Sequence, residues 1–441
     1  MTDTIAAIAT PPGQGGIGIV RVSGPAARDI GERISAHTLD PRVARRCAFL
    51  GADGAVVDDG IALLFVAPAS FTGEDVVELQ GHGGVVVMQL LLQAALDLGA
   101  RLARPGEFTE RAFLNGKLDL AQAEAVADLL ASGSQAAARA AMRSLRGEFS
   151  ERIHALDQAV LELRVYVEAA IDFPDEEVEF LSAGDVAGRL AQIEDKFAAL
   201  MSATHQGTLL RDGITVALLG APNVGKSSVL NALAAEQHAI VTDIPGTTRD
   251  LIRADVVISG LPVNLVDTAG LRDAEDVIEQ EGVRRAQAQA RSADLILLVT
   301  DLSDSDEGSL GVDEALGDAP RILVGNKVDL TKMSPGFSGP RQVRVSAVTG
   351  AGMDELRQCL LEQVGYSEQP GGFTARQRHL QALQRGLQAV RAAAVLLGER
   401  QAGELIAEEL RAVHGQLAEI VGETTTDDLL GEIFSSFCIG K

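Results

Sequence analysis

The sequence predicts a multidomain protein that combines α/β and α+β folds: an α+β domain, then a helical domain into which an α/β domain is inserted. Three observations predict this arrangement. Short β-like runs occupy residues 1–117, amphipathic helical stripes occupy 118–211 and 371–441, and apolar strands alternate with helices over 212–370. Apolar stripes on both sides of the α/β region favour one helical domain that the insertion interrupts. A length of 441 residues leaves room for about three domains.

The N-terminal region alternates short apolar runs with turn residues, which is typical of an α+β domain. One helical stretch covers about 85–99, in "VVVMQLLLQAALDLG". The region also holds the glycine pattern G-x-G-x-x-G, at Gly13, Gly15 and Gly18. A dinucleotide site needs a helix after these glycines, whereas "IVRVSG" reads as a strand, so we reject such a site. The β-like runs are 16–24, 60–68 and 76–84.

From about Leu118 the composition changes to alanine-rich helix. An apolar stripe then recurs at steps of four and three, which predicts one face of a long amphipathic helix. Two more stripes follow the α/β region. The first stripe contains Leu145, Phe149, Ile153, Leu156, Val160, Leu163 and Val167; the second contains Leu380, Leu383, Leu387, Val390, Ala394 and Leu397; the third contains Ile406, Leu410, Val413, Leu417 and Ile420.

The middle region consists of near-continuous Val, Ile and Leu runs that helical segments separate. Such runs are typical of strands in a mostly parallel sheet that is covered on both faces. We predict strands at 214–220, 263–267, 295–300, 321–326 and 343–347.

Net charge gives no support to nucleic-acid binding. The chain has 38 basic and 62 acidic residues, a formal charge of −24, which repels polyanions at long range. The net charge does not exclude such binding, because an acidic protein can still have a local basic patch. Tryptophan is absent and aromatic residues make up 3% of the chain, so broad base-stacking platforms are not expected.

The cysteines indicate a reducing compartment. Cys47, Cys359 and Cys438 are far apart and form no C-x-x-C pair, so we expect neither a disulfide framework nor a zinc site. The start, "MTDTIAAIATPPGQGG", lacks the charge and the apolar run of a signal peptide, and no stretch reaches the roughly 20 apolar residues that span a bilayer. We expect a cytoplasmic protein without membrane attachment.

A phosphate-binding loop is the strongest local signal. "GAPNVGKS" (220–227) matches G-x-x-x-x-G-K-[S/T] between a predicted strand and the helical run "SVLNALAAE". In that setting, backbone N–H groups and the helix N-terminus hold phosphates. Lys226 is placed to reach the β and γ groups, and the Ser227 hydroxyl to ligate Mg²⁺.

Three further motifs predict that the nucleotide is GTP. "DTAG" (267–270) places Asp267 near the metal and the Gly270 N–H near the γ-phosphate. In "NKVD" the Asp329 carboxylate can accept N1–H and N2–H of guanine, a donor pair that adenine lacks, and "SAVTG" supplies an N–H for guanine O6. This order resembles the Ras-like translation-factor class of P-loop GTPases over one domain. The predicted GTP-binding residues are Gly220, Asn223, Val224, Gly225, Lys226, Ser227, Ser228, Thr242, Asp243, Ile244, Gly246, Thr247, Thr248, Asp267, Thr268, Ala269, Gly270, Asn326, Lys327, Asp329, Ser346 and Ala347.

The hydrolytic apparatus departs from the Ras pattern. Leu271 follows "DTAG", where Ras-type enzymes have the glutamine that orients the attacking water. Either the domain hydrolyses GTP slowly or another group performs this role. Asn223, inside the phosphate loop, and the Thr-rich segment "TDIPGTTRD" (242–250) point to the second option. The alternative for Asn223 is that it only shapes the loop.

Motifs along the whole chain resemble those of the MnmE (TrmE) family of tRNA-modification GTPases. They are "ATPPGQGGIGIVRVSG", "FTGEDVVELQGHGG", "RPGEFTERAFLNGKLDLAQAEA", "EAAIDFPDEE", the GTP-binding motifs and the terminal "LLGEIFSSFCIGK". The resemblance implies a folate-binding and dimerising domain at 1–117, a helical domain at 118–211 and 371–441, and a Ras-like GTPase domain at 212–370.

The resemblance also implies a reaction and its partners. A homodimer would act with the flavin-dependent MnmG (GidA) in a heterotetramer or larger assembly. The product would be an aminomethyl or carboxymethylaminomethyl group at C5 of the wobble uridine of tRNA. A tetrahydrofolate derivative, in its 5-formyl or methylene form, would supply the one-carbon unit, and GTP hydrolysis would depend on K⁺ and on Mg²⁺.

Site residues follow from the same resemblance. A K⁺ ion would replace an arginine finger, and Glu279 would orient the attacking water, with Lys226 and Cys438 as the other catalytic candidates. The alternative for Glu279 is an exposed acidic helix, because several acidic residues crowd this segment. The implied K⁺ ligands are Asn223, Thr242, Ile244 and Thr247; the Mg²⁺ ligands are Ser227 and Thr248; the folate contacts are Arg21, Glu78, Lys117 and Lys441.

Cys438 lies fourth from the end, where a C-a-a-X prenylation box would place its cysteine. The letters that follow, Ile439, Gly440 and Lys441, do not fit such a box. Two alternatives stay open. The thiol packs as a small buried apolar group, or it reacts with uracil C6 while a positive charge such as Lys441 lies nearby.

We also weigh two other functions. One is a GTP-switch binding protein in ribosome assembly, and the other is a dimeric scaffold for the GTPase domain. The N-terminal region and the CIGK tail favour the modifying enzyme, because an assembly factor has no evident need for either.

Overall fold

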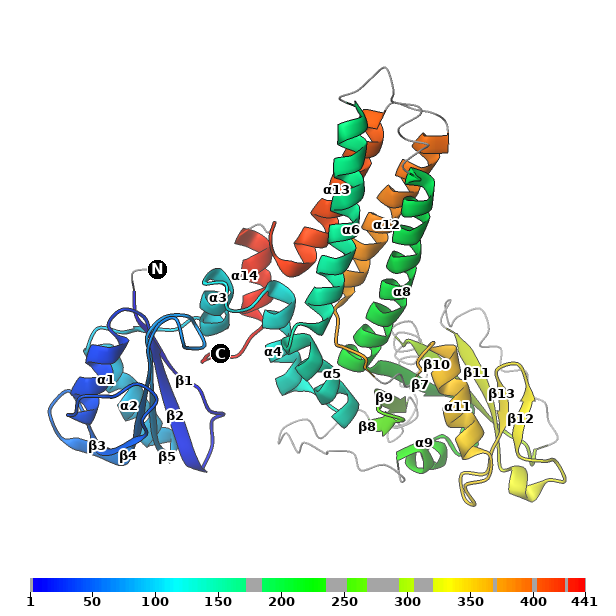
Figure 1. Cartoon of the computed structure of the whole chain (residues 1–441). Coiled ribbons are helices and arrows are strands. Elements are labelled where there is room, and N and C mark those ends of the chain that lie inside the picture. The colour runs from blue at the N-terminus through cyan, green and yellow to red at the C-terminus, as the bar shows by residue number, and fades with distance from the viewer. Residues whose placement is uncertain are drawn as a thin grey trace, which may run out of the picture. The chain divides into compact units, whose positions relative to one another are not determined.

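In the computed structural model the chain forms two compact units. Figure 1 traces their helices and strands along the chain. The described residues are 3–171, 185–234, 252–267, 293–304, 320–367, 371–398, 403–424 and 427–440. The first unit comprises Met1–Ala127, Ile153–Leu161 and Leu410–Lys441, and the second comprises Asp128–Arg152 and Glu162–Glu409. The α+β region, the helices and the mostly parallel sheet are all present, so the predicted multidomain α/β and α+β fold class is confirmed.

The first unit is built on a six-stranded sheet, among the residues that the structure describes, in the order β3-β4-β5-β2-β1-β6. All neighbouring strands are antiparallel except β1 and β6. Gly15 and Gly18 lie within β2, so the predicted strand is confirmed and the helix that a dinucleotide site needs does not follow these glycines. The elements are β1 (Ile5–Ile8), β2 (Gly15–Ser23), α1 (Ala27–Ser35), β3 (Arg45–Leu50), β4 (Val56–Phe65), β5 (Val76–Gly83), α2 (Val85–Asp97), β6 (Arg101–Leu102) and α3 (Glu107–Leu114).

The core of this unit lies between the sheet and the helices α1 and α2. Alternate residues of β2 and β5 point to one face of the sheet, and Val22 and Val77 are fully buried there. Ile30 from α1 and Leu91 from α2 belong to the same cluster. The apolar residues at alternate positions of these strands therefore face the helices that cover this side of the sheet.

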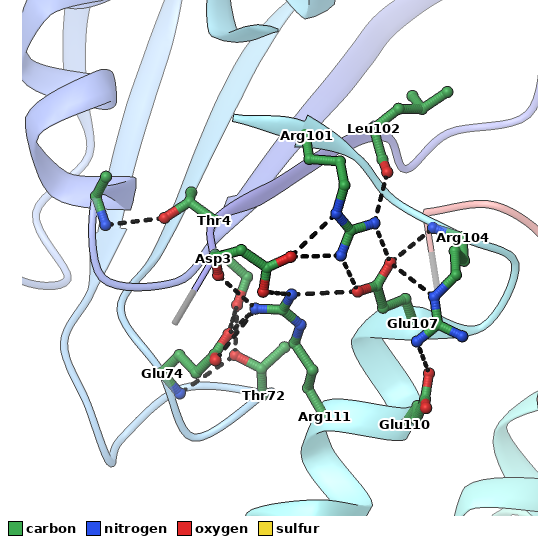
Figure 2. A network of polar contacts seen from close by, with 12 residues as sticks. Asp3, Thr4, Thr72, Glu74, Arg101, Leu102, Arg104, Glu107, Glu110 and Arg111 are labelled. Atoms are coloured by element: carbon green, nitrogen blue, oxygen red, sulfur yellow. Dashed lines mark hydrogen bonds and ion pairs between the residues drawn. The ribbon is translucent and has the colours of Figure 1, made fainter. Parts of the chain in front are cut away.

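An ion network with Arg111 and Glu107 buried at its centre holds Asp3, β6 and α3 together (Figure 2). The Arg111 side chain is fully buried and donates to Asp3 Oδ1 at 2.9 Å, Glu74 Oε2 at 3.0 Å and Glu107 Oε1 at 3.1 Å. Arg101 donates to both Asp3 and Glu107, at 2.6 Å in each case. The network joins residues that lie more than a hundred positions apart.

The second unit contains a seven-stranded sheet in the described part of the chain, in the order β12-β13-β11-β10-β7-β9-β8. Its five central strands are parallel and its two edge pairs are antiparallel. The strands are β7 (Ile214–Leu219), β8 (Ile252–Ile258), β9 (Leu261–Asp267), β10 (Leu295–Asp301), β11 (Arg321–Asn326), β12 (Gly336–Gly339) and β13 (Gln342–Arg344). The sequence predicted the five parallel strands, and it missed β8 and β12.

Helices pack on this sheet, and the remaining helices of the described chain belong to one or both of the two units. Buried Val216, Leu218 and Val299 of the sheet share one cluster with Leu230 of α9 and Leu356 of α11. In the described ranges, no helix is long and apolar enough to cross a membrane. The remaining helices are α4 (Leu120–Ala131), α5 (Gln135–Leu145), α6 (Glu148–Ile171), α8 (Val186–Asp212), α9 (Lys226–Ala234), η1 (Val328–Leu330), α11 (Met353–Gln363), α12 (Gln377–Gly398), α13 (Gly403–Val421) and α14 (Asp427–Ser435).

The structure corrects two details of the predicted helical stripes. The first stripe belongs to two helices, because the chain turns at Gly147, whose φ is 94°, so Leu145 ends α5 and only the later residues lie on α6. In α12 the buried residue is Ala393, whereas the predicted Ala394 is exposed. Periodicity placed the helices but could not reveal a break that a single glycine makes.

Candidate nucleotide and folate sites

The phosphate loop lies between β7 and α9, and its backbone requires glycine at two positions. A Cβ on Gly220 would lie 2.2 Å from the Val299 carbonyl oxygen, and one on Gly225 would lie 2.3 Å from Asn326 Nδ2. Gly225 also has a φ of 94°, and Asn223 a φ of 64°, both in the left-handed region. These conformations direct the loop around the N-terminus of α9, which is a ready binding site for phosphates.

Lys226 is the first residue of α9 and turns back across the loop. Its side chain is buried, with 6% of the residue exposed. Its Nζ donates to the carbonyl oxygens of Gly220 at 2.9 Å and Ala221 at 2.8 Å. The ammonium is thus held at the loop, where phosphate oxygens would compete with these carbonyls for it. The next residue, Ser227, is exposed in the first turn of the helix.

Asn326 connects the phosphate loop to the two guanine motifs. Its Nδ2 donates to the Val224 carbonyl at 2.9 Å, and its Oδ1 accepts from the Ala347 N–H at 3.2 Å. Ser346 is fully buried, and its hydroxyl accepts from the Thr349 N–H at 3.2 Å. One buried amide therefore fixes three segments that the sequence had assigned to one nucleotide.

The residues that follow Asn326 lie just past the end of β11, where the sequence predicts contacts with guanine. Lys327 has a φ of 65°, and its Nζ donates to Asp301 Oδ2 at 2.5 Å. Burial raises the pKa of Asp301, but hydrogen bonds from Lys327 and Ser303 outweigh it and hold that pKa below its ordinary value. Asp329 is exposed on η1, so its carboxylate is accessible to a ligand.

The described donors at the loop fit the expected metal ions. The exposed Ser227 offers a hydroxyl oxygen and Asn223 an amide oxygen, and hard oxygen donors suit Mg²⁺ and K⁺. Among the residues that the structure describes, His, Cys, Asp and Glu form no metal-binding group of three or more. Other predicted residues lie outside the described residues: Thr242, Asp243, Ile244, Gly246, Thr247, Thr248, Thr268, Ala269, Gly270, Glu279 and Lys441, together with the side chain of Asp267.

In the first unit, two of the residues expected to bind folate are direct partners. Arg21 and Glu78 lie opposite each other on β2 and β5, and Arg21 donates to Glu78 Oε1 at 2.8 and 3.1 Å. The Arg21 guanidinium also lies over the rings of Phe71 and Phe108, 5.9 and 5.8 Å from their centroids. A planar cation, a carboxylate and the exposed Phe71 ring fit a flat heterocycle that carries N–H donors, whereas the Phe108 ring is fully buried and contacts Arg21 only from the core.

Lys117 contacts the loop that contains Phe71. Its Nζ donates to the Pro68 carbonyl at 3.0 Å, and its stem lies near Gly73. The side chain is therefore anchored to the segment 68–73, whose Phe71 in turn contacts Arg21. This places Lys117 beside the same loop, rather than in direct contact with the Arg21–Glu78 pair.

The C-terminal tail lies against the first unit. The Cys438 carbonyl accepts from the Gly106 N–H at 3.3 Å, and Ile439 pairs with Pro105 in an antiparallel bridge. A Cβ on Gly440 would lie 2.3 Å from the Ile8 carbonyl oxygen, so the tail runs close to β1. Cys438 itself is exposed, which contradicts the alternative that it fills a buried apolar site.

Sequence reasoning missed three contacts at these sites. Asp301 closes β10 and accepts from Lys327, and a charged residue at the end of an apolar run was the signal that could have identified it. Phe71 and Phe108 gave no such signal, because each is an ordinary aromatic residue until the fold brings it to Arg21.

Comparisons with known proteins place the whole chain. A family model described as the GTP-binding protein TrmE N-terminus matches residues 4–117, and one described as the MnmE helical domain matches residues 120–438. The tRNA modification GTPase MnmE of Nitrosococcus oceani is 53% identical over 449 aligned residues, which cover 100% of this chain and 98% of that protein. The proteins of the same description from Hydrogenovibrio crunogenus and Methylococcus capsulatus are 51% and 52% identical, and this chain covers 99% of each. The resemblance seen in the motifs is confirmed: the chain belongs to the MnmE family of tRNA modification GTPases.

Proposed function

We propose that this protein hydrolyses GTP in the presence of Mg²⁺ and uses that reaction in the modification of tRNA. The observation that carries the proposal is the phosphate loop, with Lys226 held across it and Asn326 joining it to the guanine motifs. Relatives with about half of their residues identical over the whole chain are described as tRNA modification GTPases. We further propose a cytoplasmic location, and domain boundaries at 1–117, 118–211 with 371–441, and 212–370.

The described residues have distinct tasks in GTP binding. The N-terminus of α9 and the loop amides would hold the β- and γ-phosphates. Lys226 would exchange its loop carbonyls for phosphate oxygens, and Ser227 would contribute a hydroxyl to Mg²⁺, which neutralises charge on the phosphates when bound. Asp329 would accept the guanine donors, while Lys327, held by Asp301, would flank the base.

We propose that K⁺ supplies the positive charge that an arginine finger supplies in other GTPases. Asn223 would provide one oxygen, since its left-handed backbone lies within the phosphate loop. Its partners would be Thr242, Ile244 and Thr247, with Thr248 on Mg²⁺ and Glu279 orienting the water. GTP turnover should then be much faster in KCl than in NaCl at equal ionic strength, and equal rates would rule out the K⁺ site.

We propose a tetrahydrofolate derivative as the second ligand. Glu78 would accept pterin N–H donors, and Arg21 would present its planar cation with Phe71 and Phe108 beside it. Lys117 and Lys441 would meet the carboxylates of the glutamate tail. Glu78→Gln should weaken binding of 5-formyltetrahydrofolate without changing GTP turnover, and isothermal titration calorimetry measures this.

The full reaction that we propose needs partners. A homodimer would act with the flavoenzyme MnmG to place an aminomethyl or carboxymethylaminomethyl group on C5 of the wobble uridine. If the exposed Cys438 takes part in the reaction, Cys438→Ser should lower the yield of modified tRNA. A full yield would exclude this role.

The decisive experiment is mass spectrometry of wobble uridines from cells with and without this gene. Loss of the C5 modification on deletion, and its return with the intact gene but not with Lys226→Ala, supports the proposal. Unchanged uridines together with defective ribosomal subunits would favour a GTP switch in ribosome assembly instead.

A further inference from the structure

A pocket of about 400 Å³ in the second unit collects three arginines. Arg139 and Arg143 come from α5, one helical turn apart, and therefore from the same face of the helix. Arg152 comes from the first turns of α6, and Tyr366 and Phe373 also line the pocket. A volume of this size suits a small ligand or a short piece of a larger one.

The structure fixes two of these arginines without a carboxylate. Arg143 Nε donates to the Gly372 carbonyl at 2.5 Å, and the Arg152 guanidinium lies 5.1 Å from the centre of the Phe373 ring. Within the described part of the chain, no carboxylate forms an ion pair with Arg139, Arg143 or Arg152, and none of the lining residues is acidic. Three like charges thus converge on one space, where an anion would relieve their mutual repulsion.

The basic character extends beyond the pocket along α5. Residues 132–147 contain three arginines and no acidic residue, in a chain with a net charge of −24. The third, Arg146, is exposed and lies outside the pocket lining. A positive surface that continues past a pocket is what an extended polyanion needs, whereas a small anion needs only the pocket.

We propose that this arginine pocket binds phosphate groups of the RNA backbone, and that it is the place where this acidic protein contacts tRNA. The inference rests on the proposed function, which makes tRNA the substrate. Arginine suits the role because its planar fork can donate two hydrogen bonds to one phosphate. The contact would position the RNA without reading its sequence.

The test measures binding of a transcribed tRNA to the full chain by fluorescence anisotropy over a series of salt concentrations. The double variant Arg139→Ala/Arg152→Ala removes the two exposed arginines and leaves Arg143 on its carbonyl. We expect affinity to fall on the order of tenfold, and the slope of log affinity against log salt to decrease by roughly 0.7–0.9 per lost phosphate contact. Two tRNAs of different sequence should lose affinity equally.

Controls separate the pocket from net charge. Arg45→Ala/Arg46→Ala removes the same charge from an exposed strand of the first unit and should leave tRNA affinity nearly unchanged. Arg139→Lys/Arg152→Ala keeps the charge at position 139 but loses the planar guanidinium. Its tRNA affinity should lie between those of the parent and of the Arg139→Ala/Arg152→Ala variant. An equal loss in the two double alanine variants would overturn the inference, because affinity would then follow charge alone.

A second arm distinguishes RNA from a small phosphate compound. Inorganic pyrophosphate is titrated into the parent protein and into the Arg139→Ala/Arg152→Ala variant, and calorimetry measures its binding. If the Arg139/Arg152 variant loses pyrophosphate binding but keeps full tRNA affinity, the RNA assignment is wrong. GTP turnover without tRNA should be the same in the parent protein and in the double variant. If the parent protein does not hydrolyse GTP, the proposed function is wrong. If the double variant hydrolyses GTP and binds tRNA as tightly as the parent, only the assignment of the pocket is wrong.

Discussion

Two buried cations show how differently this fold uses a positive charge. Arg111 in the first unit is surrounded by the carboxylates of Asp3, Glu74 and Glu107. Lys226 in the second unit donates to backbone carbonyls of its own loop. The carboxylates around Arg111 neutralise its charge, and they join distant parts of the fold. Lys226 lies instead at a phosphate loop, where phosphate oxygens can replace the loop carbonyls as acceptors.

The largest effect should come from Arg111→Met. It removes the cation that Glu74 and the buried Glu107 share and leaves Glu107 with Arg101 alone, so opening of this part of the first unit should become easier by about 3–5 kcal/mol. Hydrogen exchange of β1 and α3 amides measures that opening locally. Arg104→Met, at a side chain 60% exposed, should cost less than about 1 kcal/mol. Similar exchange in both variants would mean that the network does not hold the fold.

Lys226→Ala should lower activity and hardly change stability, the opposite of what we expect for Arg111→Met. GTP turnover should fall by about 10²–10³, since a cation aimed at the transferring phosphate is lost, while hydrogen exchange of β7 should hardly change. Steady-state phosphate release measures the rate. Lys332→Ala, at an exposed lysine, is the matched control and should keep full activity. Strong destabilisation by Lys226→Ala would show that the two cations have the same role.

Gly225→Ala should have a smaller effect at the same site. Its Cβ would lie 2.3 Å from Asn326 Nδ2 and its φ of 94° would be strained, which costs about 1–3 kcal/mol of GTP binding. Binding of a fluorescent GTP analogue gives the value. Gly398→Ala, where a Cβ meets nothing within 4 Å, should leave affinity unchanged. Normal binding by the Gly225 variant would show that the loop adapts.

The smallest effect is the response of the first unit to acid. Burial raises the pKa of Glu107, but hydrogen bonds from Arg101, the Arg104 amide and Arg111 outweigh it and hold that pKa below its ordinary value of 4.5. The hydrogen bond from Arg101 does the same for Asp3. A depressed pKa contributes stability that is present above the ordinary value and is lost as the pH falls through the folded value.

The first unit should therefore lose stability as the pH falls below about 4.5, by about 1.4 kcal/mol for each pKa unit of depression. Hydrogen exchange of β1 measured between pH 6 and 3, corrected for intrinsic rates, follows this. Glu107→Gln should flatten the profile. A variant that keeps the parent's slope would assign the pH dependence to other groups.

The candidate nucleotide site was predicted from local motifs, whereas the candidate folate site was not. Lys226, Asn326 and Asp329 follow from local motifs, because a phosphate loop and a strand end each determine where their own side chains point. Arg21 and Glu78 came only from a family resemblance. Their pairing depends on the register of β2 against β5, which the sequence does not state. The edge strands β8 and β12 were missed because they lack the continuous apolar run of buried central strands.

By itself the sequence determined the fold class, the helical stripes and the order of the nucleotide motifs, since all of these are periodic or local. Only the tertiary structure decided which distant residues meet. It joined Asn326 to the phosphate loop, Asp3 to Arg111 and the tail to Gly106, and it gathered Arg139, Arg143 and Arg152 around one pocket. The physical reason is that such contacts depend on how separate elements pack, and packing sums many weak interactions along the chain that no short motif records.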